Sequence, residues 1–414
     1  MSDLIEVHTL RAFGANSANR DNNGNVKTVT VGGDQRLRYS SASRRHVIRE
    51  LFTAKFKKTY HTRHIVDALM EHAEKAGYVK DENREKMIEM FTKLVVGIKE
   101  EDETSAKKDK KKSKTDDGDE SQKKSEEKER LHVYSEAELD TIAKFVYENI
   151  NEDVDAKLKD RLNKQMKTAS VGAEIALFGR MIAGGVGDTV YSAAHTNHSY
   201  SIDDYWGEFD YFIASDNYCP NTGAGHIGHS SIASNTMYSY DNVSPVQVFK
   251  NLESALLNTD LKPEELEEQR KELKIFTRQI ILEMIKDIMF IPPSGKQNVM
   301  ASFPIPSAVY ITVLQDGFSC TIDNAFNGVI RGGKHPVAVE GTKRIVDYIV
   351  HDEQQQDYSY RVFCTDSIAE RAENKEYIGA DRLDKAIQRK KVKDLTGSVM
   401  DDLAREIDNI LSKV

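Results

Sequence analysis

Seven basic side chains lie within thirty residues near the N-terminus, and side chains of this kind bind polyanions. They are Arg20, Lys27, Arg36, Arg38, Arg44, Arg45 and Arg49. On a strand, Arg36 and Arg38 share one face, and on a helix Arg45 and Arg49 share one face at a spacing of four. Like charges at that helical spacing repel each other, so an anion between them would stabilise both.

Three serines, Ser40, Ser41 and Ser43, surround the expected start of a helix in the same block. They supply hydroxyl and backbone N–H donors, and a helix N-terminus favours a phosphate. The alternative is a solvated basic surface whose partners are carboxylates of the same chain. Composition alone does not separate these two interpretations.

The net charge of the chain conceals this basic block. The 414 residues together carry −9 at pH 7, which on its own argues against a nucleic-acid partner. Residues 1–64, however, hold 12 Lys and Arg against 5 Asp and Glu, a net charge of +7. The sign of the total therefore does not exclude RNA or DNA as a ligand.

A glycine motif in the middle of the chain is the main signal for an enzyme. Residues 223–228 match G-x-G-x-x-G, which binds dinucleotides only between a strand and a helix. The residues that follow are β-branched and aromatic and predict a strand instead. A second glycine cluster, 184–187, lacks the Lys-Ser/Thr pair of a phosphate loop. No cofactor is expected.

Two histidine pairs could be zinc ligands. His195 and His198, together with His226 and His229, lie in polar segments, and Cys219 is near them in sequence. Structural zinc sites usually bring a C-x-x-C pair or a helical His pair, and neither is present. We therefore expect hydrogen-bonded histidines and no metal; whether they contact a ligand stays open. The sequence contains no G-x-S-x-G motif, the nucleophile elbow of many hydrolases, so nothing in it points to hydrolase chemistry.

The elements that must position these residues alternate irregularly along the chain, which predicts an α+β fold with an insertion. Expected strands cover Leu4–Leu10, Val26–Val31, Gln35–Tyr39, Val171–Phe178, Ser231–Tyr240 and Val309–Val313. Expected helices follow Ser40, Ser135 and Ser244, and cover 65–76, 87–95, Pro263–Ile291 and Arg382–Val414. Serine caps, a capping box at Ser135 and glycine at 77 support the helix ends.

Composition also bounds the class of protein. Residues 99–130 contain 23 charged residues out of 32, which predicts a disordered linker. Three widely spaced cysteines favour a reducing compartment. No segment approaches the apolar length of a membrane span, and the N-terminus lacks the pattern of a signal peptide. We expect a cytoplasmic protein without membrane contact.

The N-terminal block resembles a known family. Asn19-Arg20-Asp21, Lys27 and the stretch from Gly32 to Arg49 (GGDQRLRYSSASRRHVIR) resemble the CasC-type (Cse family) backbone subunit of the type I-E CRISPR Cascade surveillance complex. The segment AEIALFGRM, residues 173–181, resembles the strand that leads into the family's thumb loop, and the likeness runs over most of the chain.

The resemblance implies a non-enzymatic scaffold without cofactor or metal. Its fold would be an RRM-like (ferredoxin-like) palm, residues 1–60 and 165–414, with a helical finger insertion, 61–164, and a thumb loop, 180–228. Its partners would be the CRISPR guide RNA, target DNA through that guide, copies of itself in a head-to-tail filament, and other Cascade subunits. The thumb would kink the guide so that the remaining bases can pair with DNA.

The resemblance also assigns residues. Arg20, Lys27, Ser40, Arg45 and Arg49 match guide-backbone contacts, and Met181, after Arg180, matches the thumb residue that inserts at the kink. Ala42 stands where the family has glutamine, which removes one polar contact. Two alternatives are kept: a backbone subunit that cleaves target RNA with metal through Asp188, and a zinc- or nucleotide-dependent enzyme.

Overall fold

The computed structural model describes residues 2–96, 131–182, 185–215, 218, 224–259, 261–293, 295–352 and 356–414. The tract 99–130 and Cys219 lie outside the described residues. The chain forms two compact units. Unit 1 comprises Met1–Lys55, Ser192–Lys250 and Glu267–Val414, and unit 2 comprises Phe56–Tyr191 and Asn251–Leu266.

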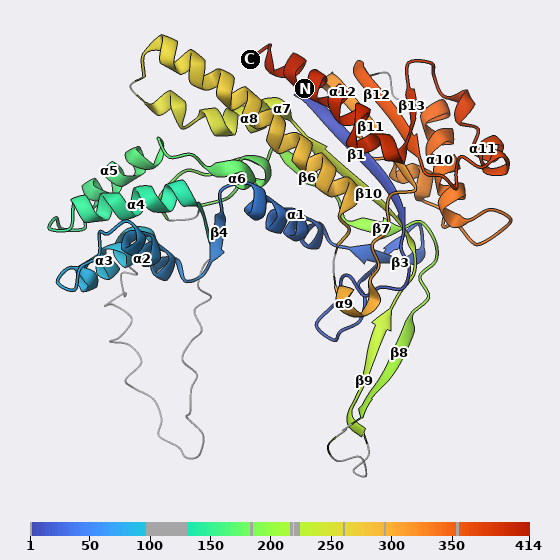
Figure 1. The fold of residues 1–414 in the computed structure, drawn as a ribbon, viewed down its shortest axis with the longest axis horizontal. Coiled ribbons are helices and arrows are strands. Elements are labelled where there is room, and N and C mark those ends of the chain that lie inside the picture. The colour runs from blue at the N-terminus through green and yellow to red at the C-terminus, as the bar shows by residue number, and fades with distance from the viewer. Residues whose placement is uncertain are drawn as a thin grey trace, which may run out of the picture. The chain divides into compact units, whose positions relative to one another are not determined.

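Unit 1 is built on one large mixed sheet, in the order β13-β12-β11-β1-β10-β7-β3-β2, with β6 also paired to β10 (Figure 1). Its strands are β1 (Ser2–Ala12), β2 (Thr28–Val31), β3 (Asp34–Tyr39), β6 (Ala194–Thr196), β7 (Ser199–Ser201), β10 (Thr236–Val243), β11 (Ala308–Gly317), β12 (Tyr358–Thr365) and β13 (Gln388–Lys391). The β12–β13 pair is parallel, and the other pairs of this sheet are antiparallel.

Strand β1 lies in the interior of this sheet, between β11 and β10, and its residues are buried on both faces. Val7 pairs with Asp241 on β10 and with Ile311 on β11. Leu10 belongs with Tyr238 and Phe326 to an apolar cluster of this unit. The helices of unit 1 include α1 (Ser41–Lys55), α9 (Gln297–Met300), α10 (Val337–Asp352), α11 (Ala372–Ile378) and α12 (Ser398–Leu411).

Unit 2 is mainly helical. Its helices are α2 (Ile65–Lys75), α3 (Arg84–Phe91), α4 (Glu136–Glu148), α5 (Ala156–Met166) and α6 (Gly172–Phe178). Strands β4 (Thr59–Thr62) and β5 (His132–Ser135), far apart in sequence, pair antiparallel as a two-stranded sheet. Leu69, Phe91 and Ile142 are fully buried in its core. The residues of α7 (Pro245–Glu253) and α8 (Pro263–Phe290) are divided between the two units.

A separate two-stranded arm belongs to unit 1. Strand β8 (Glu208–Ser215) pairs with β9 (Ala224–Ile232), and Figure 1 shows both strands extending away from the sheet. The stretch 180–228 therefore contains β6, β7, β8 and part of β9, along with irregular segments. The G-x-G-x-x-G motif runs into β9, so the residues after it are a strand and not the helix that a dinucleotide site needs.

Three expected elements were wrong. Residues 172–178 form helix α6 instead of a strand, because a short apolar run that is buried all round shows no period that separates strand from helix. The strand expected over 231–240 is two strands, β9 ending at Ile232 and β10 beginning at Thr236. The helix expected from Arg382 starts only at Ser398, because the basic residues 388–391 pair with β12 as strand β13.

Most local signals are confirmed. Ser135 and Glu138 form the expected capping box, with the Glu138 N–H donating to the Ser135 hydroxyl at 3.2 Å and the Ser135 N–H donating to the Glu138 carboxylate at 2.9 Å. The mixed α+β class is also confirmed.

Candidate nucleic-acid interface

Asn19 is hydrogen-bonded to two residues of the basic block, Lys27 and Ser40. The Lys27 N–H donates to the Asn19 carbonyl at 2.8 Å, and the Ser40 N–H donates to the Asn19 side-chain oxygen at 3.1 Å. The Arg38 N–H donates to the Lys27 carbonyl at 2.8 Å, and Arg20 forms a bridge with Val26. One side chain therefore ties the loop that carries Arg20 and Lys27 to the start of α1.

The N-terminus of α1 faces this loop. The Ser40 hydroxyl accepts a hydrogen bond from the Ser43 N–H at 3.2 Å, so Ser40 is the expected cap. Arg20 is exposed, and Lys27, Arg38, Ser41 and Ser43 are half-exposed around it. Exposed cations beside a helix N-terminus form a surface on which phosphate oxygens can be bound.

His198 is part of this surface, although sequence reasoning left its role open. Its Nδ1 accepts a hydrogen bond from the Ser41 N–H at 3.4 Å. Partial burial and the nearby charges of Arg38 and Arg44 lower the pKa of His198. Burial first, and the two positive charges after it, favour the neutral form of the ring. His195 lies elsewhere on this stretch, with its Nδ1 at 2.8 Å from the Asn242 side-chain oxygen.

Arg45 and Arg49 lie on one face of α1, as the spacing predicts. Burial lowers the pKa of Arg45, and the like charge of Arg49 lowers it further. Both side chains are half-exposed. The nearby Asp241 carboxylate offsets part of this effect by raising the pKa of Arg45.

Arg44 instead has a partner inside the fold. Its guanidinium lies 2.5 Å from the Asp241 carboxylate, and both side chains are buried. It also donates to the carbonyl and side-chain oxygens of Asn197, at 3.0 and 2.9 Å. Arg44 therefore anchors α1 to β10, and its charge is neutralised within the protein.

Arg36 is also an internal residue, with no exposed surface. It donates to the Ser201 carbonyl at 3.2 Å and to the Asn327 carbonyl at 3.1 Å. Arg36 shares a strand face with Arg38, yet Arg36 is buried with its guanidinium bonded to these two carbonyls, whereas Arg38 is half-exposed. Burial lowers the pKa of Arg36.

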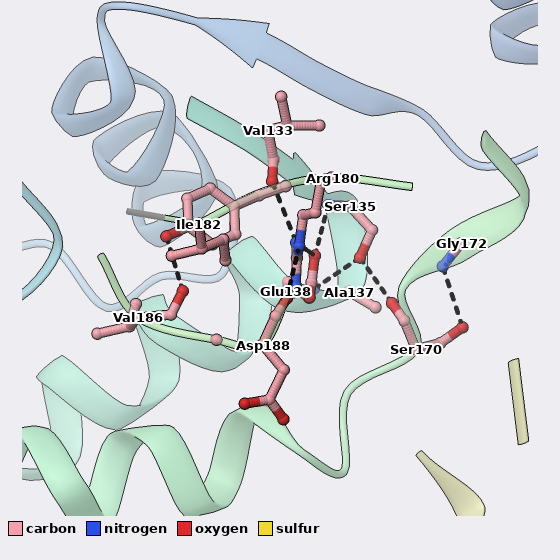
Figure 2. Close-up of polar contacts among 12 residues, drawn as sticks. Val133, Ser135, Ala137, Glu138, Ser170, Gly172, Arg180, Ile182, Val186 and Asp188 are labelled. Atoms are coloured by element: carbon pink, nitrogen blue, oxygen red, sulfur yellow. Dashed lines mark hydrogen bonds and ion pairs between the residues drawn. The ribbon is translucent and has the colours of Figure 1, made fainter. Parts of the chain in front are cut away.

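In unit 2, Arg180 is held in a buried ion pair, and Met181 after it is exposed. Figure 2 shows the Arg180 guanidinium meeting both carboxylate oxygens of Glu138, at 2.5 and 2.6 Å. It also donates to the carbonyls of Val133 and Asp188. Met181, in contrast, is 84% exposed. Arg180 therefore has a positioning role, and Met181 is the side chain that the segment presents.

The candidate catalytic residue Asp188 contacts Arg180 through its backbone carbonyl. Figure 2 shows the Asp188 carboxylate turned away from Arg180, and Asp188 is exposed. Across the described parts of the chain, no group of three His, Cys, Asp or Glu residues could hold a metal ion. His226 and His229 lie on β9 near the rings of Phe212 and Phe209.

The β8–β9 arm carries an apolar stripe that sequence reasoning did not find. Phe209, Tyr211 and Ile213 alternate along β8 and therefore share one face, and all three are exposed. An exposed apolar stripe on a two-stranded arm indicates a surface for a partner. The alternation of apolar residues along β8 was visible in the sequence, but the same alternation is typical of a strand that packs on a hydrophobic core.

Comparison with known proteins shows the family to which this chain belongs. A family model described as CT1975-like protein matches residues 5–396. This chain belongs to the CT1975-like protein family. Its fold is similar to a chain of a "CRISPR RNA-guided surveillance complex, pre-nicking", with a TM-score of 0.68 at 18% sequence identity over 98% of this chain and 100% of that chain.

A second solved structure agrees with the first. A chain of a "CRISPR RNA-guided surveillance complex" matches with a TM-score of 0.53 at 17% identity, over 98% of this chain and 99% of that chain. No curated protein matches the sequence. The resemblance is therefore confirmed at the level of family and fold. No helix among the described residues is long and apolar enough to cross a membrane.

Proposed function

We propose that this protein is a CRISPR RNA-binding backbone subunit of a type I-E Cascade complex. The observation that carries the proposal is the convergence of Arg20, Lys27, Arg38 and the Ser40 cap at the N-terminus of α1. Membership of the CT1975-like family and the fold shared with chains of RNA-guided surveillance complexes support it. Arg45 and Arg49 extend the same basic surface along the helix.

The chemistry of this surface suits a guide of any sequence. Ammonium, guanidinium, hydroxyl and backbone N–H groups bind phosphate and ribose, which carry no sequence information. Specificity is then left to base pairing between guide and target DNA, as in other guided systems. Binding to phosphates releases counterions and is therefore sensitive to salt.

Two further surfaces complete the proposed role. Exposed Met181 is an apolar wedge that can insert at a kink in the guide without reading a base, as apolar wedges do in duplex steps. The β8–β9 arm, with its apolar stripe, contacts the next copy of the chain in a head-to-tail filament. The protein itself performs no catalysis in this proposal, and no observation favours RNA cleavage through Asp188.

The test is co-expression with the remaining Cascade subunits and a repeat–spacer array, followed by sequencing of the RNA that the purified complex retains. We expect a discrete CRISPR RNA. The triple variant R20Q/K27Q/R38Q should retain less RNA. The slope of log binding constant against log salt concentration should also become shallower by about 2, because each lost single-strand phosphate contact removes about 0.7. The control K262Q/K271Q/K286Q removes the same charge from exposed positions.

Retention of unrelated cellular RNA, or equal retention by the triple variant and its control, would overturn the proposal. RNA cleavage that requires metal and disappears in Asp188→Ala would instead establish the catalytic alternative.

A further inference from the structure

A cavity of 470 Å³ lies at the β13 edge of the unit 1 sheet, and its lining is rich in cations. Five basic side chains line it, Lys375, Arg389, Lys390, Lys391 and Lys393, against three acidic ones, Glu370, Asp381 and Asp394. They come from α11, β13 and the turns that follow these elements (Figure 1). This sequence segment was expected to be helical, so its residues were not recognised as a site.

Each acidic residue of the cavity already has a partner. Glu370 accepts a hydrogen bond from the Thr365 hydroxyl at 2.5 Å, and Asp394 accepts one from the Lys391 backbone N–H at 2.9 Å. Asp381 forms an ion pair with Arg389. Of the three carboxylates, Asp381 is the one paired with a basic side chain of the lining, and five basic against three acidic side chains leave an excess of two positive charges.

Three lysines at the cavity have no carboxylate partner within the described residues. They are Lys375, Lys391 and Lys393, and all three are exposed. Lys390 is different, because its ammonium lies 2.7 Å from the Asp402 carboxylate. Like charges gathered around one cavity repel each other, and an anionic ligand would remove that repulsion.

The arrangement along β13 suits a repeating anion. Arg389 and Lys391 face the same side of the sheet as their register partners Phe363 and Thr365, because side chains alternate along a strand. Alternate residues of a strand lie about 6.6 Å apart. That spacing is comparable with the separation of consecutive phosphates along a nucleic-acid strand. Lys393 follows in a short 3₁₀ helix, Val392–Thr396, and lines the same cavity.

A second cavity adjoins the first and has an apolar part. It has a volume of 440 Å³ and shares Lys391, Lys393 and Glu370 with the first; Phe290, Ile305 and Val392 line it together with Asp366 and the hydroxyl side chains of residues 365, 367 and 396. A basic row beside an aromatic and aliphatic pocket can hold a phosphate backbone and one of its bases together. Lysines on an edge strand disfavour the addition of a peptide strand, which argues against a protein ligand here.

We propose that this cavity, which we call the β13 site, binds the phosphodiester backbone of a nucleic-acid strand. The site is distinct from the N-terminal basic block. Strand β3, which carries Arg38, lies six strands from β13 in the same sheet. Since neighbouring strands are about 4.8 Å apart, the two surfaces are separated by about 29 Å. The strand is either DNA or a part of the guide that the N-terminal block does not hold.

The test uses the purified, guide-loaded complex with the triple variant K375Q/K391Q/K393Q. Binding of a labelled thymidine oligonucleotide and of a labelled duplex of unrelated sequence is measured against salt. The salt slope for the oligonucleotide should fall by about 2, at about 0.7 for each lost phosphate contact. The control is K271Q/K286Q on α8, and the rescue variant K375R/K391R/K393R keeps the charge.

The retained guide is quantified in the same preparations. Unchanged guide retention with weaker probe binding would assign the β13 site to DNA, and lower guide retention would assign it to the guide. Probe binding and guide retention both equal to wild type would overturn the proposal. So would displacement of the probe by polyglutamate more readily than by unlabelled oligonucleotide, because the ligand would then be an acidic protein segment. The proposed function is tested separately, by the amount of RNA that the R20Q/K27Q/R38Q complex retains, so failure of one proposal can be told from failure of the other.

Discussion

Arg180 and Glu138 form a buried ion pair with two parallel hydrogen bonds, directly before the exposed residue Met181. The guanidinium and carboxylate meet at 2.5 and 2.6 Å, and only 2% and 1% of the two side chains are exposed. Glu138 also accepts the Ser135 N–H as part of the α4 capping box. One carboxylate therefore fixes both the start of α4 and the segment that presents Met181.

Replacement of Glu138 by Gln should destabilise the protein strongly. Loss of one partner leaves the Arg180 charge buried without compensation, which costs about 3–5 kcal/mol in the free energy of unfolding. Urea denaturation measures this. The control is Glu89→Gln, which removes an exposed pair with Lys93 and should cost less than about 1 kcal/mol. Equal losses in the two variants would show that the buried pair does not stabilise unit 2.

The apolar stripe on β8 should be needed for assembly and not for folding. In F209S/Y211S/I213S, the free energy of unfolding should stay within about 0.5 kcal/mol of wild type, because the side chains are exposed. The mass of guide-loaded assemblies, measured by sedimentation, should fall. Asp210→Asn changes the opposite face of the same strand and should leave assembly intact. Assemblies of unchanged mass in the triple variant would exclude the arm as an interface between copies.

Gly32 and Gly33 form a matched pair at the β2–β3 turn. Both have positive φ, +64° and +90°, so alanine at either position costs about 1 kcal/mol in backbone strain. A Cβ at Gly32 would lie 1.7 Å from the Asn327 carbonyl oxygen, which also accepts from Arg36, whereas a Cβ at Gly33 meets nothing within 4 Å. Gly32→Ala should therefore lower the urea midpoint more than Gly33→Ala. Similar midpoints would mean that the turn is not packed against residue 327.

The stability of unit 1 should fall in acid through His8. Burial lowers the pKa of His8 to about 3. The unfolded chain binds a proton near pH 6.5, whereas the folded protein does not until about pH 3. The contribution of His8 to the free energy of unfolding is therefore fully present above pH 6.5. It is lost as the pH falls towards 3, by up to about 1.4 kcal/mol per pH unit.

Denaturation midpoints measured across that pH range test the effect. His8→Phe should flatten the dependence, because the aromatic ring stays and the titrating group is removed. His46→Gln, at an exposed position on α1, should leave the slope of the wild type. A slope in His8→Phe equal to that of the wild type would assign the acid sensitivity to other groups.

Local signals in the sequence predicted local structure well. The Ser40 cap, the Ser135–Glu138 capping box and the Gly32-Gly33 turn depend on residues within four positions of one another, so the sequence displays them directly. Helix α6 was missed because all of its apolar residues are buried, and burial comes from packing with distant segments. Strand β13 was missed because its basic sequence shows no strand pattern, and only its pairing with β12 makes it one.

The candidate site divides in the same way. Residue type and spacing alone placed a basic block with a helix N-terminus near the start of the chain, and put Arg45 and Arg49 on one helix face. Only the tertiary structure decided which cations are accessible. Arg36, Arg44 and Arg180 find their partners at Asn327, Asp241 and Glu138, which are far away in sequence. Whether a charge faces solvent or a buried carboxylate depends on long-range contacts, which spacing along the chain does not show.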